Sequence, residues 1–311
     1  METRKKISVI VPCFNEEESL GTFNRALISV LPTSYLWEII YVNDGSSDHT
    51  FQVIQALAKE NQDIKYISFS RNFGHQNALK AGYDFASGDC AISLDADLQH
   101  PPSVIPELIS KWEEGFEIVN TQRNDHKSIS YSKKMSSKIF YQIMRKLSDV
   151  NIENGMADFR LVDKKVVKQL KLFPENFLFF RGIIPWMGFN QTTVPFTANE
   201  RFAGSTKYTF KKMLKFATAG VTAFSVKPLR ISIYLGSVFA FLAFIYGVYI
   251  TYVYIFTNQA ITGWTSVILS VLFVGGINLL MLGIIGEYLG KLFIENKRRP
   301  NYLISETNFP E

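Results

Sequence analysis

Short runs of β-branched and aliphatic residues recur through the first 120 positions, and each run is followed by a longer segment with apolar residues at helical spacing. Turn-forming residues such as Pro12 separate the two kinds of segment. Strands that alternate with helices of this length form βαβ units, so the pattern predicts an α/β fold with a doubly wound, mostly parallel sheet. The predicted strands cover 7–11, 38–42, 64–69, 91–94 and 117–120, and the predicted helices cover 16–30, 75–86, 103–114, 163–172 and a segment that begins at 50.

Charged side chains follow the predicted strands at the point where each strand ends. In an open α/β sheet these ends line one crevice, where such folds bind their ligands. Asp95 and Asp97 lie two positions apart and project to one side of an extended chain, with Gln99 next in that series. Oxygen ligands of this kind suit Mg²⁺ or Mn²⁺, although the two carboxylates could instead only end the strand and cap the next helix. The full set at the strand ends is Glu16, Asp44, Arg71, Asp95, Asp97 and Arg123.

Phosphate recognition is the chemistry that these residues favour. The chain contains neither a Gly-x-Gly-x-x-Gly sequence nor a P-loop, so a bound metal is expected to neutralise a diphosphate. Arg201 and Lys207 flank a Gly-Ser-Thr segment, which suits a loop that closes over phosphates or, alternatively, a solvated loop. Asp158 and Arg160, in a predicted turn at 154–160, form either a surface ion pair or part of the reaction centre.

The second half of the chain is apolar and basic. No Asp or Glu occurs from Phe202 through Gly286. Two apolar runs are each long enough to cross a bilayer: about 229–256, where Arg230 at the start is the only charge, and about 264–286, which carries no charge. Lys and Arg flank this pair of spans, whereas the link between them carries no charge, so the positive-inside rule places both termini in the cytoplasm. We therefore predict an integral membrane protein with two spans, a cytoplasmic catalytic domain and a basic tail over 291–311.

Two basic segments before the spans have amphipathic character. Between 127 and 146 there are six Lys or Arg and no acid, and apolar residues recur every four positions. This pattern predicts a helix over about 129–147, either with an ordinary solvated face or lying on anionic headgroups; the neighbouring spans favour the membrane surface. A second amphipathic helix is predicted over 209–228.

Charge, cysteine content and the first apolar run narrow the choice of partners and of cellular compartment. The excess of basic residues, 33 against 28 acidic, is small and gives no reason to expect a nucleic-acid partner. Cys13 and Cys90 lie in or beside strand-like segments, and we expect buried free thiols in a reducing compartment. The first apolar run is too short for a signal peptide, which again favours a cytoplasmic catalytic domain.

Taken together, these motifs resemble the polyprenyl-phosphate glycosyltransferases of glycosyltransferase family 2. These are the dolichol-phosphate mannose synthase-like enzymes, and the similarity is greatest to the bacterial bactoprenol glucosyltransferases with two C-terminal transmembrane helices. It spans nearly the whole chain, and the order and spacing of the motifs are highly specific. The motifs are Val9–Glu17, Val42–Asp48, Arg71–Gln76, Leu94–Pro102, Asp158–Leu161, Arg201–Tyr208 and Gly286–Gly290.

The resemblance implies a GT-A type domain over 1–208, followed by the juxtamembrane helix and the transmembrane hairpin (229–290). It implies Mg²⁺ or Mn²⁺ bound by Asp95, Asp97 and Gln99, and Asp158 as the general base, although we expect Asp158 to orient the acceptor as much as it accepts a proton. The nucleotide sugar would contact Pro12, Phe14, Glu16, Asp44, Ala96, Asp97, Arg201 and Lys207, and the acceptor phosphate would contact Arg123, Lys133 and Ser137. Ala198, Thr206 and Lys133 depart from the family pattern, where Arg, Ser and Arg are usual.

The implied reaction is inverting transfer of a hexose, with UDP-glucose as the first choice of donor, to undecaprenyl or dolichyl phosphate. Alternatives within the family are a GDP-mannose-dependent dolichol-phosphate mannose synthase and an amino-sugar transferase. A processive polysaccharide synthase would need more spans and a Gln-x-x-Arg-Trp motif, which the sequence lacks. A catalytically idle nucleotide-binding membrane scaffold is disfavoured because the acidic pair is intact. The sequence is compatible with a homo-oligomer.

Overall fold

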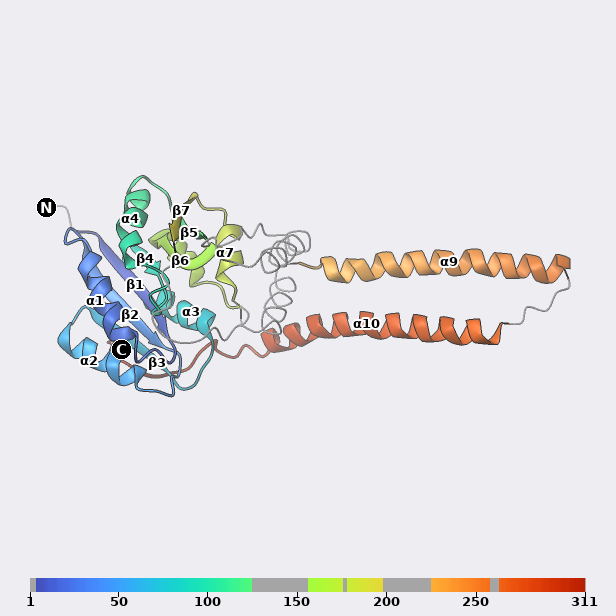
Figure 1. Cartoon of the computed structure of the whole chain (residues 1–311), viewed down its shortest axis with the longest axis horizontal. Coiled ribbons are helices and arrows are strands. Elements are labelled where there is room, and N and C mark those ends of the chain that lie inside the picture. Colours follow the sequence, from blue (N-terminus) through green and yellow to red (C-terminus); the bar gives the residue numbers. More distant parts are fainter. Residues whose placement is uncertain (1–3, 125–155, 176–177, 198–224, 258–262, 311) are drawn as a thin grey trace. The chain divides into compact units, whose positions relative to one another are not determined.

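The computed structural model describes residues 4–124, 156–175, 178–197, 225–257 and 263–310 (Figure 1). The chain divides into two compact units, and each is described by itself. The first unit, which holds most of 1–213 and the segment after 298, is built on one eight-stranded sheet. The second unit holds two long helices.

The sheet is mixed and mostly parallel, as the alternating pattern predicts. Its order is β7-β5-β6-β4-β1-β2-β3-β8, with β1 paired in parallel to both β2 and β4, β2 to β3, and β5 to β7. The five predicted strands are confirmed with small shifts at their ends. The strands are β1 (Lys6–Cys13), β2 (Leu36–Asn43), β3 (Ile64–Phe69), β4 (Cys90–Ser93), β5 (Ile118–Asn124), β6 (Met156–Asp163), β7 (Gln191–Thr197) and β8 (Ile304–Thr307).

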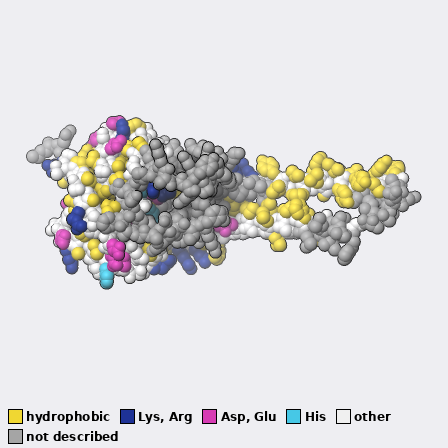
Figure 2. All heavy atoms as spheres, viewed as in Figure 1, with side chains coloured by type: hydrophobic (Ala, Val, Ile, Leu, Met, Phe, Trp, Pro, Cys, Tyr) yellow, Lys and Arg dark blue, Asp and Glu magenta, His cyan; other side chains and the backbone are white. Residues whose placement is uncertain are grey.

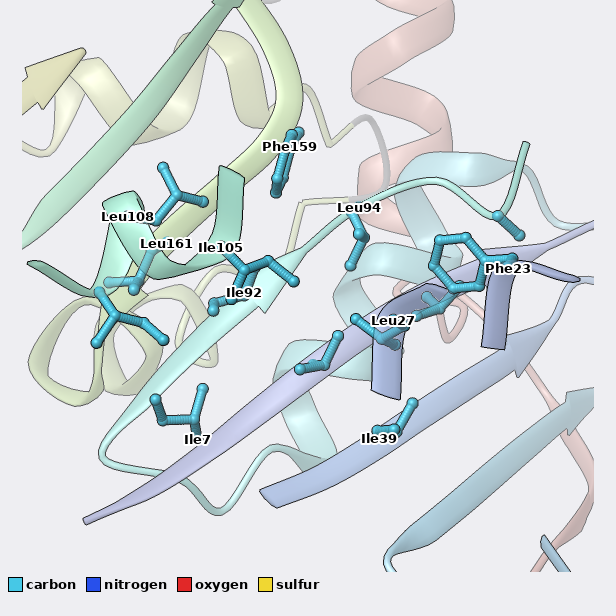
Figure 3. Packing of buried hydrophobic residues seen from close by; sticks show 14 of the residues in the cluster. Ile7, Phe23, Leu27, Ile39, Ile92, Leu94, Ile105, Leu108, Phe159 and Leu161 are labelled. Carbon is cyan, nitrogen blue, oxygen red and sulfur yellow. The ribbon is translucent and has the colours of Figure 1, made fainter. Parts of the chain in front are cut away.

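Helices cover both faces of the sheet, as expected for a doubly wound fold. Figure 3 shows apolar side chains of α1 and α4 packed over those of the central strands; the labelled helix residues are Phe23, Leu27, Ile105 and Leu108. On the opposite face α3 lies close to β1, where an added Cβ on Gly82 would be 2.1 Å from the Cγ2 atom of Ile10. The helices of this unit are α1 (Leu20–Val30), α2 (Thr50–Glu60), α3 (His75–Phe85), a 3-10 turn at Pro102–Val104, α4 (Ile105–Glu113), α6 (Lys164–Leu170) and α7 (Phe180–Trp186).

Strand β6 corrects one expectation, because the predicted turn at 154–160 is wrong for residues 156–160. This segment belongs to a buried strand that runs antiparallel between β4 and β5. The strand is difficult to predict from the sequence because Asp158 and Arg160 interrupt its apolar residues. The two side chains lie on the same face of the strand and pair with each other, which allows both charges to be buried.

The C-terminal segment adds the last strand of the sheet. Strand β8 pairs antiparallel with the edge strand β3, and the Ser70 N–H donates to the Leu303 carbonyl at 3.0 Å. Tyr302 stacks on Phe69 with ring centroids 5.0 Å apart, and its hydroxyl donates to Asp84. Much of the predicted basic tail therefore belongs to the first compact unit.

The second unit contains α9 (Lys227–Thr257) and α10 (Trp264–Asn296). Within them, Ile233–Val253 and Phe273–Asn296 are long and apolar enough to cross a membrane, and their side chains are not buried in the protein. Figure 2 shows hydrophobic side chains along the described parts of both helices. Phe239 and Phe273 join α9 to α10, with ring centroids 5.5 Å apart. The predicted helix at 129–147 and most of the one at 209–228 lie outside the described residues.

Candidate active site

Three loops at the carboxyl ends of β1, β2 and β3 hold one another in place. The Asn15 N–H donates to the Ser46 hydroxyl at 3.0 Å, and the Asn15 side-chain oxygen accepts from the Ser47 N–H at 2.8 Å. Gly45 has φ +63°, and an added Cβ would lie 2.3 Å from the backbone carbon of Arg71. Only glycine fits where these loops approach so closely. The strand ends therefore form a tightly packed rim for a ligand.

Asp44 anchors the segment that leads into α3. Its buried carboxylate accepts from the Phe73 N–H at 2.7 Å and from the Gly74 N–H at 3.0 Å. Burial raises the pKa of Asp44, although these backbone donors favour its charged form. The residue expected to contact the nucleotide thus fixes the loop beside it.

Asp95 lies just past β4 and contacts two imidazoles. Its Oδ1 atom is 2.8 Å from Nε2 of His75, and its Oδ2 atom is 3.4 Å from Nδ1 of His100. Burial alone would raise the pKa of Asp95, but His100 and His75 outweigh it and hold this pKa well below its usual range. Burial alone would lower the pKa of His75, but the Asp95 carboxylate raises it to about 9. At neutral pH the structure therefore favours a His75–Asp95 ion pair.

Asp97 and Gln99 lie on the turn that follows, and both are partly exposed. The Gln99 N–H donates to Oδ1 of Asp97 at 3.0 Å, and Leu98 between them adopts φ +61°. No group of three His, Cys, Asp or Glu side chains capable of holding a metal occurs among the described residues. Any cation at Asp95 and Asp97 would therefore take further oxygens from Gln99 or from a bound phosphate, a common arrangement for Mg²⁺.

Asp158 is buried in β6 and is held by side chains from three elements. Its Oδ1 accepts from Nη2 of Arg160 at 3.2 Å. Its Oδ2 accepts from Nε and Nη2 of Arg181 on α7, at 3.1 and 2.9 Å, and from Nε2 of Gln76 on α3 at 3.4 Å. The Asp158–Arg160 pair is thus buried rather than on the surface. Burial alone would raise the pKa of Asp158, but Arg181 and Arg160 outweigh it and lower this pKa.

The first turn of α3 connects the two carboxylate clusters. His75 contacts Asp95, and the adjacent Gln76 contacts Asp158. Gln76 also accepts from the Phe180 N–H at 2.9 Å, which ties α3 to the start of α7. Sequence reasoning did not assign site roles to His75, Gln76 or Arg181. The motif at 71–76 contained a signal for the first two, whereas Arg181 depends on a tertiary contact that its local sequence does not reveal.

The other predicted site residues divide by their placement. Pro12 and Ala96 are buried at strand ends, Phe14 is 44% exposed, and Oε2 of Glu16 accepts from the Ser19 hydroxyl at 2.6 Å. Arg123 is exposed at the end of β5. The remaining ones, Lys133, Ser137, Arg201 and Lys207, lie outside the described residues.

Two family descriptions match the chain. Residues 8–171 match glycosyl transferase family 2, and residues 227–292 match the GtrB C-terminal hairpin. The second match coincides with α9, α10 and their link.

Curated relatives match over nearly the full length. The chain is 42% identical to the prophage bactoprenol glucosyl transferase homolog of Escherichia coli, over 96% of this chain and 98% of the relative. It is 40% identical to the bactoprenol glucosyl transferase of Shigella phage SfV, with the same coverage. Among solved structures, mannosyl-3-phosphoglycerate synthase from Rubrobacter xylanophilus is 14% identical over 70% of this chain and 72% of its own. Its TM-score of 0.50 indicates a shared fold.

Proposed function

Because the chain belongs to glycosyltransferase family 2, we propose that it transfers glucose from UDP-glucose to a polyprenyl phosphate. The observation that carries this proposal is the 40–42% identity to bactoprenol glucosyl transferases over nearly the whole chain. The match includes the apolar hairpin as well as the α/β domain. The hairpin would hold the α/β domain at the membrane, where the lipid acceptor lies.

The reaction is a single displacement with inversion at the anomeric carbon. An oxygen of the polyprenyl phosphate forms a bond to that carbon while the bond to the diphosphate breaks, and UDP leaves with the electron pair. A phosphate monoester with a second pKa near about 6 is mostly dianionic at neutral pH, so the attacking oxygen carries no proton to remove. Catalysis is then largely a matter of positioning and charge stabilisation.

The rim of the crevice supplies the proposed donor site. Asp44, Pro12 and Phe14 would contact the nucleotide, and the partly exposed carboxylates of Asp95 and Asp97 fit a hard divalent cation. When bound there, Mg²⁺ or Mn²⁺ would neutralise charge on the departing diphosphate. The His75–Asp95 pair keeps the Asp95 carboxylate ionised, as a ligand must be.

Asp158 is proposed to orient the acceptor. Two guanidiniums hold it as a carboxylate, which makes it a weak proton acceptor but a fixed negative group beside the crevice. Arg123, Lys133 and Ser137 are proposed to bind the acceptor phosphate, and Arg201 and Lys207 the donor diphosphate. We further propose that the hairpin spans the membrane with the catalytic unit and both termini in the cytoplasm, where nucleotide sugars are made.

The experiment is a donor panel on membranes that contain the full chain. Radiolabelled UDP-glucose, UDP-galactose, GDP-mannose and a UDP-amino sugar are incubated with undecaprenyl or dolichyl phosphate, and label in the organic phase is counted. We expect label from UDP-glucose, none after EDTA treatment, and at least a roughly 100-fold loss in Asp97→Asn. Label from GDP-mannose alone would instead favour a mannosyltransferase. No label from any donor would favour the nucleotide-binding scaffold and overturn the proposal.

A further inference from the structure

The buried Asp158 carboxylate accepts hydrogen bonds from three side chains. One oxygen accepts from Arg160, and the other accepts twice from Arg181 and once from Gln76. The backbone is also fixed, because the Asp158 carbonyl accepts from the Ser93 hydroxyl at 2.6 Å. A carboxylate held in this way keeps one rotamer and one ionisation state.

We propose that Arg181 and Gln76 are positioning residues that hold the Asp158 carboxylate in its working orientation. This proposal rests on the transfer reaction proposed above and assigns roles to two residues that contact Asp158 rather than the reacting atoms. Arg181 provides the charge and the fork geometry. Gln76 secures Asp158 and the start of α7 together.

Arg181 differs from Arg160 in its exposure to solvent. The Arg160 side chain is only 1% exposed, and its Nη2 atom also donates to the Ala157 carbonyl at 2.8 Å, so it belongs to the core of β6. The Arg181 side chain is 34% exposed, whereas the carboxylate that it binds is 6% exposed. Arg181 therefore reaches a buried charge from the solvent side, and its loss would leave that buried charge with fewer partners.

Gln76 lies next to a residue that contacts the proposed metal ligand Asp95. Gln76 follows His75, which contacts Asp95. One helical turn therefore contacts both Asp95, in the proposed donor site, and Asp158, which is proposed to orient the acceptor. The preceding residues Phe73 and Gly74 are fixed by Asp44. A shift of this turn would consequently disturb both carboxylates, and small changes of position are costly in a displacement reaction.

A double-mutant cycle on the full-length protein in lipid nanodiscs tests the proposal. The variants are Arg181→Met, Asp158→Asn and the double variant, assayed for kcat and for the KM of each substrate. We expect Arg181→Met to lower kcat roughly 10- to 100-fold with a much smaller change in donor KM. In the Asp158→Asn background the same change should cost less than about 2-fold, because the group that Arg181 positions is already altered.

Two further variants separate positioning from folding. Arg181→Lys keeps the charge but loses the two-donor guanidinium geometry, and it should retain more of the wild-type kcat than Arg181→Met. Gln76→Met should lower kcat in the wild type and have a smaller effect in the Asp158→Asn background. Arg25→Met, the same chemical change on the exposed side of α1, is the matched control and should leave kcat unchanged. Equal losses of kcat from Arg181→Met with and without Asp158→Asn would overturn the proposal, as would an effect on acceptor KM alone.

If the wild-type protein transfers no sugar to lipid, the proposed function fails but the contact can still be tested. The same cycle is then measured by thermal unfolding of the full chain. Non-additive losses of stability would support the contact between Arg181 and Asp158, whereas additive losses would contradict it.

Discussion

At the scale of single residues, the candidate site is organised by carboxylates whose partners are fixed before any substrate binds. Asp44 accepts from two backbone N–H groups, Asp95 pairs with His75, and Asp158 is held by Arg160 and Arg181. Each partner stabilises the charged form of the carboxylate against the cost of burial. The site therefore keeps its negative groups ionised in a partly closed environment.

Titration of the substrate-free protein should reveal the charge on Asp158. The charged and titratable groups that act on it are Arg160 from its own strand, Arg181 from α7, and His75 and Tyr83 from α3. Because Arg181 lowers the pKa of Asp158, Arg181→Met should raise this pKa. The folded-state pKa is depressed, so the ionised form persists above it and is lost as the pH falls through it. NMR titration of isotope-labelled aspartate carboxyls in the wild type and the variant checks this, with Asp158→Asn to assign the signal; an unchanged Asp158 pKa would be inconsistent with it.

Prediction from sequence placed correctly the residues whose position follows from local order. Asp95, Asp97 and Asp44 follow strands, and their position at the carboxyl edge is a property of the α/β fold. Arg181 could not be found in this way, because its partner Asp158 is 23 residues away and meets it only through packing of α7 against β6. The turn predicted at Asp158 is wrong, because two opposite charges two positions apart interrupt the apolar residues of a buried strand.

At the scale of elements, close packing of α3 on β1 places the first turn of α3 beside Asp95 and Asp158. Helix α3 begins at His75 and passes over Ile10 at Gly82, where no side chain other than hydrogen fits. The strand alternation predicted both elements, but it did not predict how closely they approach. The position of the His75–Gln76 pair depends on this approach.

A pair of glycine variants tests that close packing. Gly82→Ala should destabilise the protein by about 1–3 kcal/mol, since the new methyl group would overlap the buried, β-branched side chain of Ile10. Gly21→Ala, also in a helix, has only the end of the Arg25 side chain nearby at 3.9 Å and should be neutral or stabilising by up to about 1 kcal/mol. Thermal or denaturant unfolding measures both. Similar effects from the two substitutions would argue against the close approach of α3.

The C-terminal strand should protect the edge of the sheet. Removal of residues 301–311 deletes β8 and exposes the hydrogen-bonding edge of β3. The Tyr66 and Ser70 amides, which donate to Asn308 and Leu303, should then exchange with solvent faster by roughly tenfold. Amides in the central strand β1 serve as the internal control. Unchanged exchange at Tyr66 and Ser70 would show that β8 does not form in solution.

At the scale of the whole molecule, the chain joins an α/β unit to an apolar helix pair. The mostly parallel sheet and the two long helices were predicted from patterns in the sequence, because each depends on periodicity or on a long apolar run, whereas the GT-A type was implied by the family resemblance. The antiparallel strands β6 and β8 and the helix α7 were not predicted, since they are short or carry charges that only the tertiary structure compensates. The full-length similarity to bactoprenol glucosyl transferases connects the two parts in one function.

Identification of both products of one reaction tests that function most directly. Purified full-length protein in nanodiscs is given UDP-glucose, Mg²⁺ or Mn²⁺ and undecaprenyl phosphate, and the released nucleotide and the lipid are analysed together. We predict equal amounts of UDP and of a lipid monophosphate that carries glucose with the anomeric configuration inverted, and neither product from Asp97→Asn. Release of UMP with a lipid diphosphate, or of UDP with free glucose and no glycolipid, would contradict the account.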